Sequence, residues 1–289
     1  MDTNSFHTAK QNKRPLILDG AMGSLLQQKG FTSSGASWMT DVNSNSPETI
    51  ISIYREYIKS GADIITTNTF RTNPVAQRDS EKVNSQSLVK SAVQIATEVK
   101  NGSSVLIAGS NAPAEDCYQK ERTIAQKGLE LNHINHIDLL MDSGVDFILN
   151  ETLSHFDEIK VICSHCSNHK IPYVVSLYAD SNLKILSGEN IELIYKFIWE
   201  HNPLAIGFNC IIPEVFESTI TKLNTECEWG FYINCGAGLP SDHNITCAIS
   251  PAEYADFVKK QLNLLPSFTG SCCGSSPEHT KAIKKVIDG

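Results

Sequence analysis

The sequence lacks any long uninterrupted apolar run. No stretch approaches the ~20 apolar residues of a membrane-spanning helix, and residues 1–15 are polar, without the apolar segment of a signal peptide. Basic residues are also in the minority, since 24 lysines and arginines against 32 acidic residues give a net charge of −8. This balance argues against nucleic acids and anionic membranes as partners. We therefore expect a cytoplasmic protein that binds neither.

The chain also lacks a Gly-x-Gly-x-x-Gly turn after its first apolar run, internal repeats and a clear domain linker. The candidate turn Gly20-Ala21-Met22-Gly23 has the wrong glycine spacing for dinucleotide binding, which argues against a doubly wound open sheet. What is present is an ordinary globular composition, with 41% hydrophobic and 19% charged residues over 289 positions. A chain of this length fits one α/β barrel domain.

Short apolar runs alternate along the chain with segments of helical spacing. Ser-Pro pairs at 46–47, 250–251 and 276–277 are typical of helix starts, and Gly61 and Gly144 are typical of helix ends. Helices are expected at 46–59, 84–100, 121–141, 155–168, 190–201, 213–225, from 250 onward and at 277–287. Strands are expected at 16–18, 63–68, 104–109, 146–150, 172–177, 204–208, 230–233 and directly before Cys272. The pattern predicts a single (β/α)₈ TIM barrel over residues 15–289, with residues 1–14 as a loosely ordered tail.

Cysteine is unusually frequent, and two cysteines are adjacent. Nine cysteines, an odd number without a secretory signal, favour thiol or metal chemistry in a reducing compartment over a disulfide framework. Cys272 and Cys273 lie between Gly270 and Gly274 on a predicted strand-to-helix turn. These glycines allow the backbone to leave strand geometry so that both thiols converge. Two ordinary buried thiols are the alternative interpretation.

The barrel prediction places the candidate site at the carboxyl ends of the strands. Cys210 ends the sixth strand and supplies a third thiol, near the strand that precedes Cys272 and Cys273. Three thiolates with an open fourth position are typical of a catalytic Zn²⁺ site. The other polar residues at strand ends are Asp19, Asn68, Thr69, Glu151, Asn209 and Asn234.

The remaining cysteines and the histidines are weaker candidates. Cys163 and Cys166 form a C-x-x-C on a predicted helix and are interpreted as structural. Cys235 is expected to point away from Asn234 on its strand end. No role is assigned to three cysteines in helix or loop context: Cys117, Cys227 and Cys247. Surface or capping roles are expected for the histidines on predicted helices, at positions 133, 136, 155, 165, 169, 201 and 279.

Four motifs together resemble the homocysteine S-methyltransferase family over about residues 16–287. They are Asp19-Gly20-Ala21-Met22-Gly23, Asn150-Glu151-Thr152, Gly207-Phe208-Asn209-Cys210 and the segment from Gly270 to His279. The resemblance implies a (β/α)₈ barrel with a Cys₃ zinc site formed by Cys210, Cys272 and Cys273. It also implies that Asp19 and Glu151 hold the amino group of homocysteine. The alternative for these two acids is structural: Asp19 would cap its turn, and Glu151 would accept from backbone donors.

The other candidate residues receive supporting roles. The backbone amides of Gly20, Ala21, Met22 and Gly23 are expected to cradle the substrate carboxylate, with Asn68 and Thr69 as further donors. Asn209 is expected to orient Cys210 or another ligand. Asn234 is placed at or near the fourth zinc position, and shaping the turn at Gly236 is its alternative role.

The implied reaction is zinc-dependent methyl transfer to homocysteine, giving methionine. S-methylmethionine or S-adenosylmethionine is the expected donor, and betaine or a methylcobalamin partner are the alternatives. A non-catalytic zinc- or thiol-binding barrel and a covalent cysteine nucleophile also stay open. The chain departs from the family pattern at Ser271, where a second glycine is usual, and at Ser154-His155, where proline often follows. The sequence does not indicate an oligomeric state.

Overall fold

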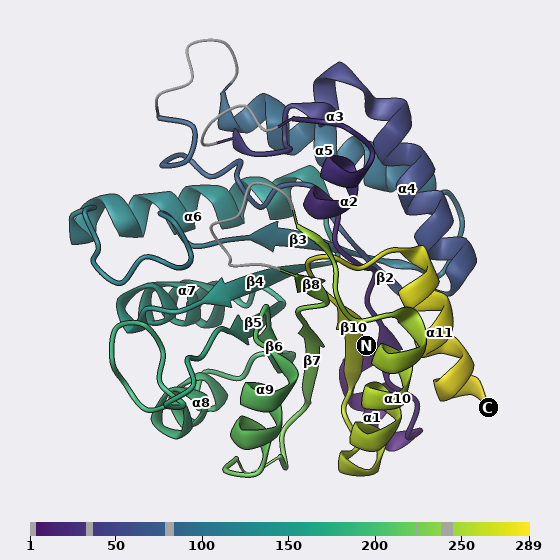
Figure 1. Cartoon of the computed structure of the whole chain (residues 1–289). Helices are drawn as coiled ribbons and strands as arrows, with labels where there is room; N and C mark the ends of the chain where they lie inside the picture. The colour runs from purple at the N-terminus through teal and green to yellow at the C-terminus, as the bar shows by residue number, and fades with distance from the viewer. Residues whose placement is uncertain (1–3, 33–36, 79–83, 224, 238–244) are drawn as a thin grey trace.

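The computed structural model describes residues 4–32, 37–78, 84–223, 225–237 and 245–289. Its central feature is an eight-stranded, all-parallel sheet with the order β1-β10-β7-β6-β5-β4-β3-β2. A parallel bridge between Leu18 and Ile64 joins the first and last strands of this order and closes the barrel. Helices surround the barrel (Figure 1). The prediction of a single (β/α)₈ barrel is confirmed.

The strands are short and buried on both faces, as expected of parallel strands that are covered by helices. They are β1 (Leu16–Ile17), β2 (Ile64–Thr66), β3 (Leu106–Asn111), β4 (Phe147–Leu153), β5 (Tyr173–Leu177), β6 (Ala205–Asn209), β7 (Trp229–Ile233) and β10 (Phe268–Ser271). A small antiparallel hairpin, β8 (Gly236–Ala237) with β9 (Thr246–Cys247), follows β7. The strand before Cys272 begins only at Phe268, because the apolar residues Leu262–Leu264 upstream form a 3₁₀ turn.

The helices begin and end at the expected signals. Proline stands in the first turn of α4 (Pro47–Ser60), α9 (Pro213–Ile220), α10 (Pro251–Gln261) and α11 (Pro277–Asp288). Helices α4 and α6 (Gln126–Ser143) end at Gly61 and Gly144, whose backbones adopt the left-handed conformation. The remaining helices are α2 (Gly23–Gln28), α3 (Val42–Asn45), α5 (Ser85–Lys100), α7 (Phe156–His169) and α8 (Ile191–Trp199). Because α6 begins at Gln126 and not at 121, residues 112–125 are a loop at the top of the barrel.

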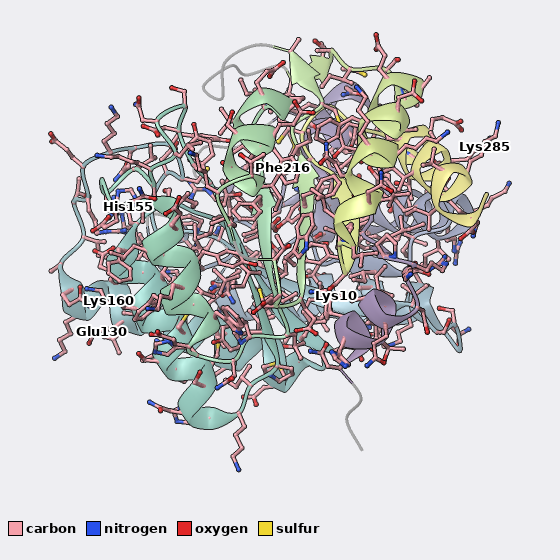
Figure 2. All side chains as sticks on the ribbon, turned by 90° about the horizontal axis from the view of Figure 1, so that it is seen from below. Lys10, Glu130, His155, Lys160, Phe216 and Lys285 are labelled. Atoms are coloured by element: carbon pink, nitrogen blue, oxygen red, sulfur yellow. The ribbon has the colours of Figure 1, made fainter. Side chains whose placement is uncertain are left out.

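Residues 4–14 differ from the predicted loose tail over residues 1–14, of which residues 1–3 lie outside the described ranges. Residues Ser5–Gln11 form helix α1, whose N-terminus is capped by the Asn4 side chain. Phe6 is buried against Phe147 of β4 and Phe268 of β10, with ring centroids 5.4 and 5.5 Å away. The Lys10 ammonium (Figure 2) donates to the carbonyls of residues 225, 226 and 227. This polar segment is ordered because one aromatic side chain enters the barrel interior, a contact that its composition did not indicate.

Two apolar layers stabilise the fold. The barrel interior contains Phe6 together with inward-facing strand residues such as Leu149, Val174 and Phe268. The larger layer lies between the strands and the helices, where Phe216 of α9 (Figure 2) packs 4.7 Å from the Phe231 ring of β7. Burial of this apolar surface is the main driving force for closing the barrel.

Among the described residues, the helices are all too short or too polar to cross a membrane.

Candidate metal centre

Three cysteines meet at the carboxyl end of the barrel. Cys210 follows β6, while Cys272 and Cys273 follow β10, and β7 lies between these two strands. The three Sγ atoms lie within 4.8 Å of one another, and those of Cys272 and Cys273 are 3.9 Å apart. The sequence prediction that three separated thiols converge is therefore confirmed. They form the one group of potential metal ligands found in the part of the chain that the structure describes.

The backbone leaves strand geometry in both of the loops that carry the clustered cysteines. Cys210 adopts a left-handed conformation, with φ of 55°, which is uncommon for a residue with a side chain and typical of functional sites. Gly274 has φ of 83°, and a Cβ there would lie 2.5 Å from the Gly236 Cα. A residue with a side chain would therefore clash at position 274, so glycine is needed to bring the two loops together.

The spacing and the surroundings of the thiols fit a tetrahedral thiolate metal. Sulfur ligands at ~2.3 Å in a tetrahedron lie about 3.8 Å from one another, close to the 3.9 Å between Cys272 and Cys273. Hydrogen bonds with Cys210 and Cys273, together with burial, raise the pKa of the Cys272 thiol well above its usual range. Without a cation the three thiols cannot all be ionised, whereas a bound divalent metal stabilises three thiolates.

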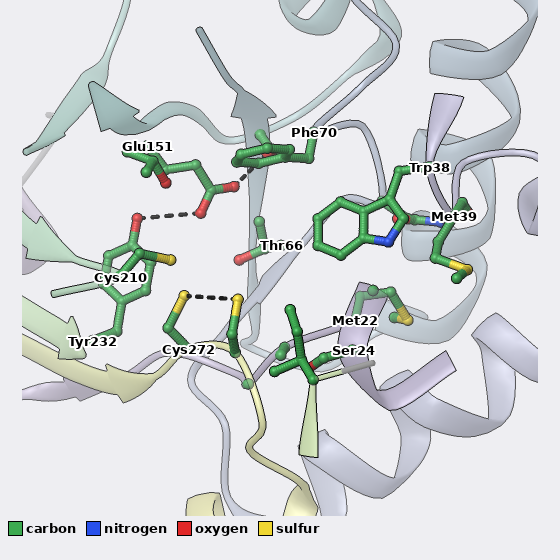
Figure 3. Close-up of a pocket in the computed structure, with 18 of the residues that line it drawn as sticks. Met22, Ser24, Trp38, Met39, Thr66, Phe70, Glu151, Cys210, Tyr232 and Cys272 are labelled. Carbon is green, nitrogen blue, oxygen red and sulfur yellow. Dashed lines mark hydrogen bonds between the residues drawn. The ribbon is translucent and has the colours of Figure 1, made fainter. Parts of the chain in front are cut away.

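Two acidic side chains face the same cavity. The Asp19 carboxylate accepts hydrogen bonds from the Thr66 amide at 2.9 Å and the Thr66 hydroxyl at 3.0 Å. The Glu151 carboxylate accepts one from the Ser110 hydroxyl and one from the Tyr232 hydroxyl at 3.3 Å (Figure 3). Burial raises the pKa of Asp19 to about 8 and that of Glu151 to about 7. The positive charge of a ligand ammonium would offset the cost of the desolvated carboxylates, so both acids are suited to bind one.

The glycine-containing turn after β1 is joined to the loop that carries the paired cysteines. The Ala21 amide donates to Ser275 Oγ at 3.1 Å, and the Gly274 amide donates to Ser24 Oγ at 2.9 Å. A Cβ at Gly20 would lie 2.7 Å from Ser275 Oγ and from the Tyr57 hydroxyl, which explains glycine at that position. The Ala21 amide is therefore already engaged, and the predicted carboxylate cradle is reduced to the amides of Gly20, Met22 and Gly23.

The two hydrogen-bond donors predicted after β2, Asn68 and Thr69, already donate to other groups of the protein. Asn68 lines the cavity, but its side-chain amide donates to the Met39 carbonyl and to Asn43 Oδ1, both at 3.0 Å. Thr69 is fully buried, and its hydroxyl donates to the Ser110 carbonyl at 2.8 Å. The position of Thr69 does not fit the predicted contact with substrate, because its side chain lies behind the cavity wall.

The two strand-end asparagines, Asn209 and Asn234, form hydrogen bonds that fix the backbone near the clustered cysteines. Asn209 accepts from the Thr152 amide and donates to the Thr152 hydroxyl, both at 2.8 Å, so it fixes the strand end that carries Glu151. Asn234 lines the cavity, and its Oδ1 accepts from the Gly236 amide at 2.8 Å. That bond is the turn-forming role, which the sequence left as the alternative to a place at the fourth metal position.

Several residues that line the cavity were not predicted as site residues from the sequence. The rings of Trp38 and Phe70 pack edge to face, with centroids 6.2 Å apart. Cys117 and Tyr118 line the cavity from the loop after β3, although no role was assigned to Cys117. Burial, Asp116 and Cys210 raise the pKa of the Cys117 thiol. These residues lie in irregular segments, where the pattern of apolar residues says nothing about position.

The other cysteines lie outside the cluster, as expected. Cys163, Cys166 and Cys235 are fully buried and do not line the cavity. Cys227 contacts the Tyr195 hydroxyl, and Cys247 is exposed.

The expectation of surface or capping roles for the histidines is correct only in part. His279 forms the capping box of α11 with Ser276. By contrast, His133 and His136 are fully buried, because their partners Glu158 and Thr72 satisfy them inside the fold.

Comparison with known proteins decides the family. The family model described as homocysteine S-methyltransferase matches residues 16–287. The chain belongs to the homocysteine S-methyltransferase family. Its motif resemblance is thereby confirmed, and the protein is an enzyme of this family.

Solved structures share the fold of this homocysteine S-methyltransferase. The metallated form of the homocysteine methyltransferase MmuM from Escherichia coli matches with a TM-score of 0.81 and 20% identity, over 97% of this chain and 99% of that one. The oxidized form matches with a TM-score of 0.84 and 20% identity, over 98% and 99%. At this identity the comparison shows the common barrel.

Ser271 is the position at which the motif resemblance led us to expect a second glycine. It is the last residue of β10 and pairs with Ile233, so the strand accommodates its side chain without distortion. Its buried hydroxyl has no hydrogen-bond partner among the described residues, and the residue lines the cavity. The serine therefore adds a polar atom beside the cysteines and removes no ligand.

Proposed function

We propose that the protein transfers a methyl group from a sulfonium donor, S-methylmethionine or S-adenosylmethionine, to the sulfur of homocysteine, giving methionine. The proposed cofactor is one zinc ion held by Cys210, Cys272 and Cys273. The observation that carries the proposal is the thiol cluster, with Sγ atoms within 4.8 Å of one another, beside the acids Asp19 and Glu151 in one cavity. Three soft ligands favour zinc over magnesium or calcium.

The acidic side chains supply the contact for homocysteine. Asp19 and Glu151 are fixed by Thr66, Ser110 and Tyr232, so their oxygens are held in place before the ligand arrives. An ammonium group between them would form charge-assisted hydrogen bonds in a site of low polarity. Free amides in the turn after β1 would receive the carboxylate of the same amino acid.

The opposite wall of the cavity supports a cationic donor. Trp38 and Phe70 lie across the cavity from Cys210 and Cys272 (Figure 3). Aromatic faces attract cations such as a sulfonium centre. The described residues of the wall include no histidine, so the general base that a covalent cysteine nucleophile would need is missing there.

The chemical step is a direct displacement. A bound zinc ion supplies the charge that keeps the homocysteine sulfur deprotonated at neutral pH. The thiolate sulfur forms a bond to the donor methyl carbon while the bond from that carbon to the sulfonium sulfur breaks. The electron pair of the broken bond stays on the donor, which leaves as a neutral thioether. The protein contributes orientation, which holds the two sulfurs in line.

The test measures metal content and methionine formation in the same variants. Cys273→Ala should lose most of the zinc and the methyl transfer, because two thiolates bind zinc far more weakly than three. Cys163→Ala is the matched control, since it removes a buried thiol that does not line the cavity. Full zinc retention in Cys273→Ala would remove this residue from the site, and a wild-type protein that forms no methionine with any sulfonium donor would refute the activity.

A further inference from the structure

The charges around the cavity are unequal in number. Among the described lining residues, Asp19, Asp116 and Glu151 are acidic and Arg71 is the one cationic side chain. Asp19, which is buried, and Glu151, which is half-buried, lie at the ends of β1 and β4 and line the cavity together with the cysteines. Arg71 and Asp116 belong to the loops after β2 and β3, and Asp116 is exposed. The cavity therefore has an inner acidic end and an outer pair of opposite charges.

Arg71 is oriented but not neutralised. Its Nη1 donates to the Glu115 carbonyl at 2.8 Å, which fixes the guanidinium against the loop after β3. The carboxylate of Glu115 is turned to Thr123, from which it accepts the amide and the hydroxyl. Within the described ranges no carboxylate lies within salt-bridge distance of Arg71. A guanidinium held in this way keeps N–H donors available for a planar carboxylate.

Asp116 is held in place by its own loop. Its Oδ1 accepts from the Tyr118 amide at 2.8 Å, and the Tyr118 ring packs on Tyr178 with centroids 5.4 Å apart. The same loop is fixed to the end of β4, because Ser154 Oγ donates to the Cys117 carbonyl at 3.0 Å. The second carboxylate oxygen of Asp116 remains available at the cavity mouth. Phe70 precedes Arg71 directly, so the aromatic wall and this charged pair are parts of one surface.

We propose that Arg71 and Asp116 bind the head group of the methyl donor, Arg71 its carboxylate and Asp116 its ammonium, so that the donor is an α-amino acid sulfonium. The inference rests on the proposed function and assigns two residues to the donor, since both proposed sulfonium donors carry this head group. A donor with a carboxylate but no ammonium, such as betaine, uses only half of this site. Homocysteine engages the inner acids, so the two amino acids enter with their head groups at opposite ends and their sulfurs between them.

The experiment compares three sulfonium donors that carry both, one or neither of the charged groups. They are S-methylmethionine, dimethylsulfoniopropionate and trimethylsulfonium, each assayed with homocysteine and the zinc-loaded enzyme. Arg71→Ala should raise the KM of the first two donors about 10- to 100-fold and leave that of trimethylsulfonium unchanged. Asp116→Asn, which keeps the acceptor for Tyr118, should raise the KM of S-methylmethionine alone. The KM of homocysteine should stay the same in both variants.

Matched controls remove exposed charges from the same loop. Lys120→Ala and Glu121→Gln should leave the KM of all three donors unchanged. Arg71→Lys, which retains the charge, should recover part of the loss and guards against a folding defect in Arg71→Ala.

Two outcomes overturn the inference while the proposed function survives. In one, donor KM values do not change in either variant. In the other, the KM of homocysteine rises instead, which would place Arg71 at the acceptor. If the wild-type protein forms no methionine, calorimetric binding of S-methylmethionine to the wild-type protein and to Arg71→Ala decides the inference separately: equal affinities overturn it.

Discussion

Asp19 is a buried and Glu151 a half-buried carboxylic acid, and neither has a cationic partner among the described residues. Burying a charge without a partner is costly, and here the cost appears as raised pKa values. Their hydrogen bonds to Thr66, Ser110 and Tyr232 hold them in place but do not neutralise them. Such residues favour ligand binding at the expense of the stability of the empty protein.

We predict that Asp19→Asn stabilises the metal- and substrate-free protein in mildly alkaline solution. The pKa of Asp19 is about 8 in the folded protein, against ~3.9 in an unfolded chain. Between these values the folded state holds a proton that the unfolded state has lost. The stability of the wild-type protein therefore falls as pH rises through this window and levels off above pH ~8. Asparagine has no such titration; its amide oxygen can accept from the Thr66 amide, and its amide nitrogen can donate to the Thr66 hydroxyl.

Thermal unfolding of both proteins at pH 5 and pH 8.5 tests this. The melting temperature of Asp19→Asn should exceed that of the wild-type protein by more at pH 8.5 than at pH 5, while homocysteine binding is lost. A variant that is less stable than the wild-type protein at pH 8.5 would contradict the proposed cost of this buried charge.

At the scale of elements, the loop from Ala112 to Ala125 is fixed by the start of the next β/α unit. The carboxylate of Glu158, fully buried on α7, accepts from the Ala114 amide at 2.7 Å, contacts His133 Nε2 at 3.0 Å and pairs with Arg122 at 3.3 Å. His155 Nε2 lies 3.0 Å from the Lys120 carbonyl. Because this loop carries Asp116 and Tyr118, these contacts position the cavity wall from a distance.

Glu158→Gln should destabilise the protein by about 1–3 kcal/mol, because it removes the buried charge that accepts from the Ala114 amide and pairs with Arg122, while Arg122 keeps its ion pair with Asp157 at 2.9 Å. Burial acts to raise the pKa of Glu158, but His133, Arg122 and the Ala114 amide together hold it at about 2. This contribution to stability is therefore present above the unfolded pKa of ~4.3 and is lost as pH falls toward 2. Chemical denaturation at pH 7 gives the free energy of unfolding.

The matched control is Glu130→Gln, an exposed acid on α6 (Figure 2), which should change stability by less than ~0.5 kcal/mol. Equal effects of the two substitutions would show that the Glu158 network does not hold the loop.

The elements also explain how much of the site the sequence predicts. Asp19, Glu151, Cys210 and the paired cysteines were found because parallel strands of a barrel end on one face, so residues far apart in the chain meet there. Trp38, Phe70 and Tyr118 were missed because they lie in loops whose path depends on tertiary contacts. The loop after β3 was hidden further because residues 121–125 were assigned to a helix. These residues do not form a helix, because contacts with Glu158 and His155 hold the loop in another conformation.

On the scale of the whole molecule, the two ends of the barrel serve different purposes. The carboxyl ends of the strands carry the cysteines, the acids and the charged loops. The opposite end is closed by α1, with Phe6 in the barrel interior and Lys10 bound to the carbonyls that precede β7. In barrels of this kind catalytic residues gather at one end, and the other end contributes stability. A change at the α1 end should therefore alter stability without altering chemistry.

Phe6→Ala tests this separation. The ring fills space between Phe147 and Phe268, and its removal leaves a cavity at the base of the barrel, so we expect a loss of about 3–5 kcal/mol in the free energy of unfolding. Zinc content and the KM values of both substrates should stay at the wild-type level below the unfolding transition. His7→Ala, on the exposed side of the same helix, is the control, and its ion pair with Glu228 is worth at most ~1 kcal/mol. If Phe6→Ala lowers zinc content or changes either KM in the folded protein, the two ends of the barrel are coupled and this division of roles is wrong.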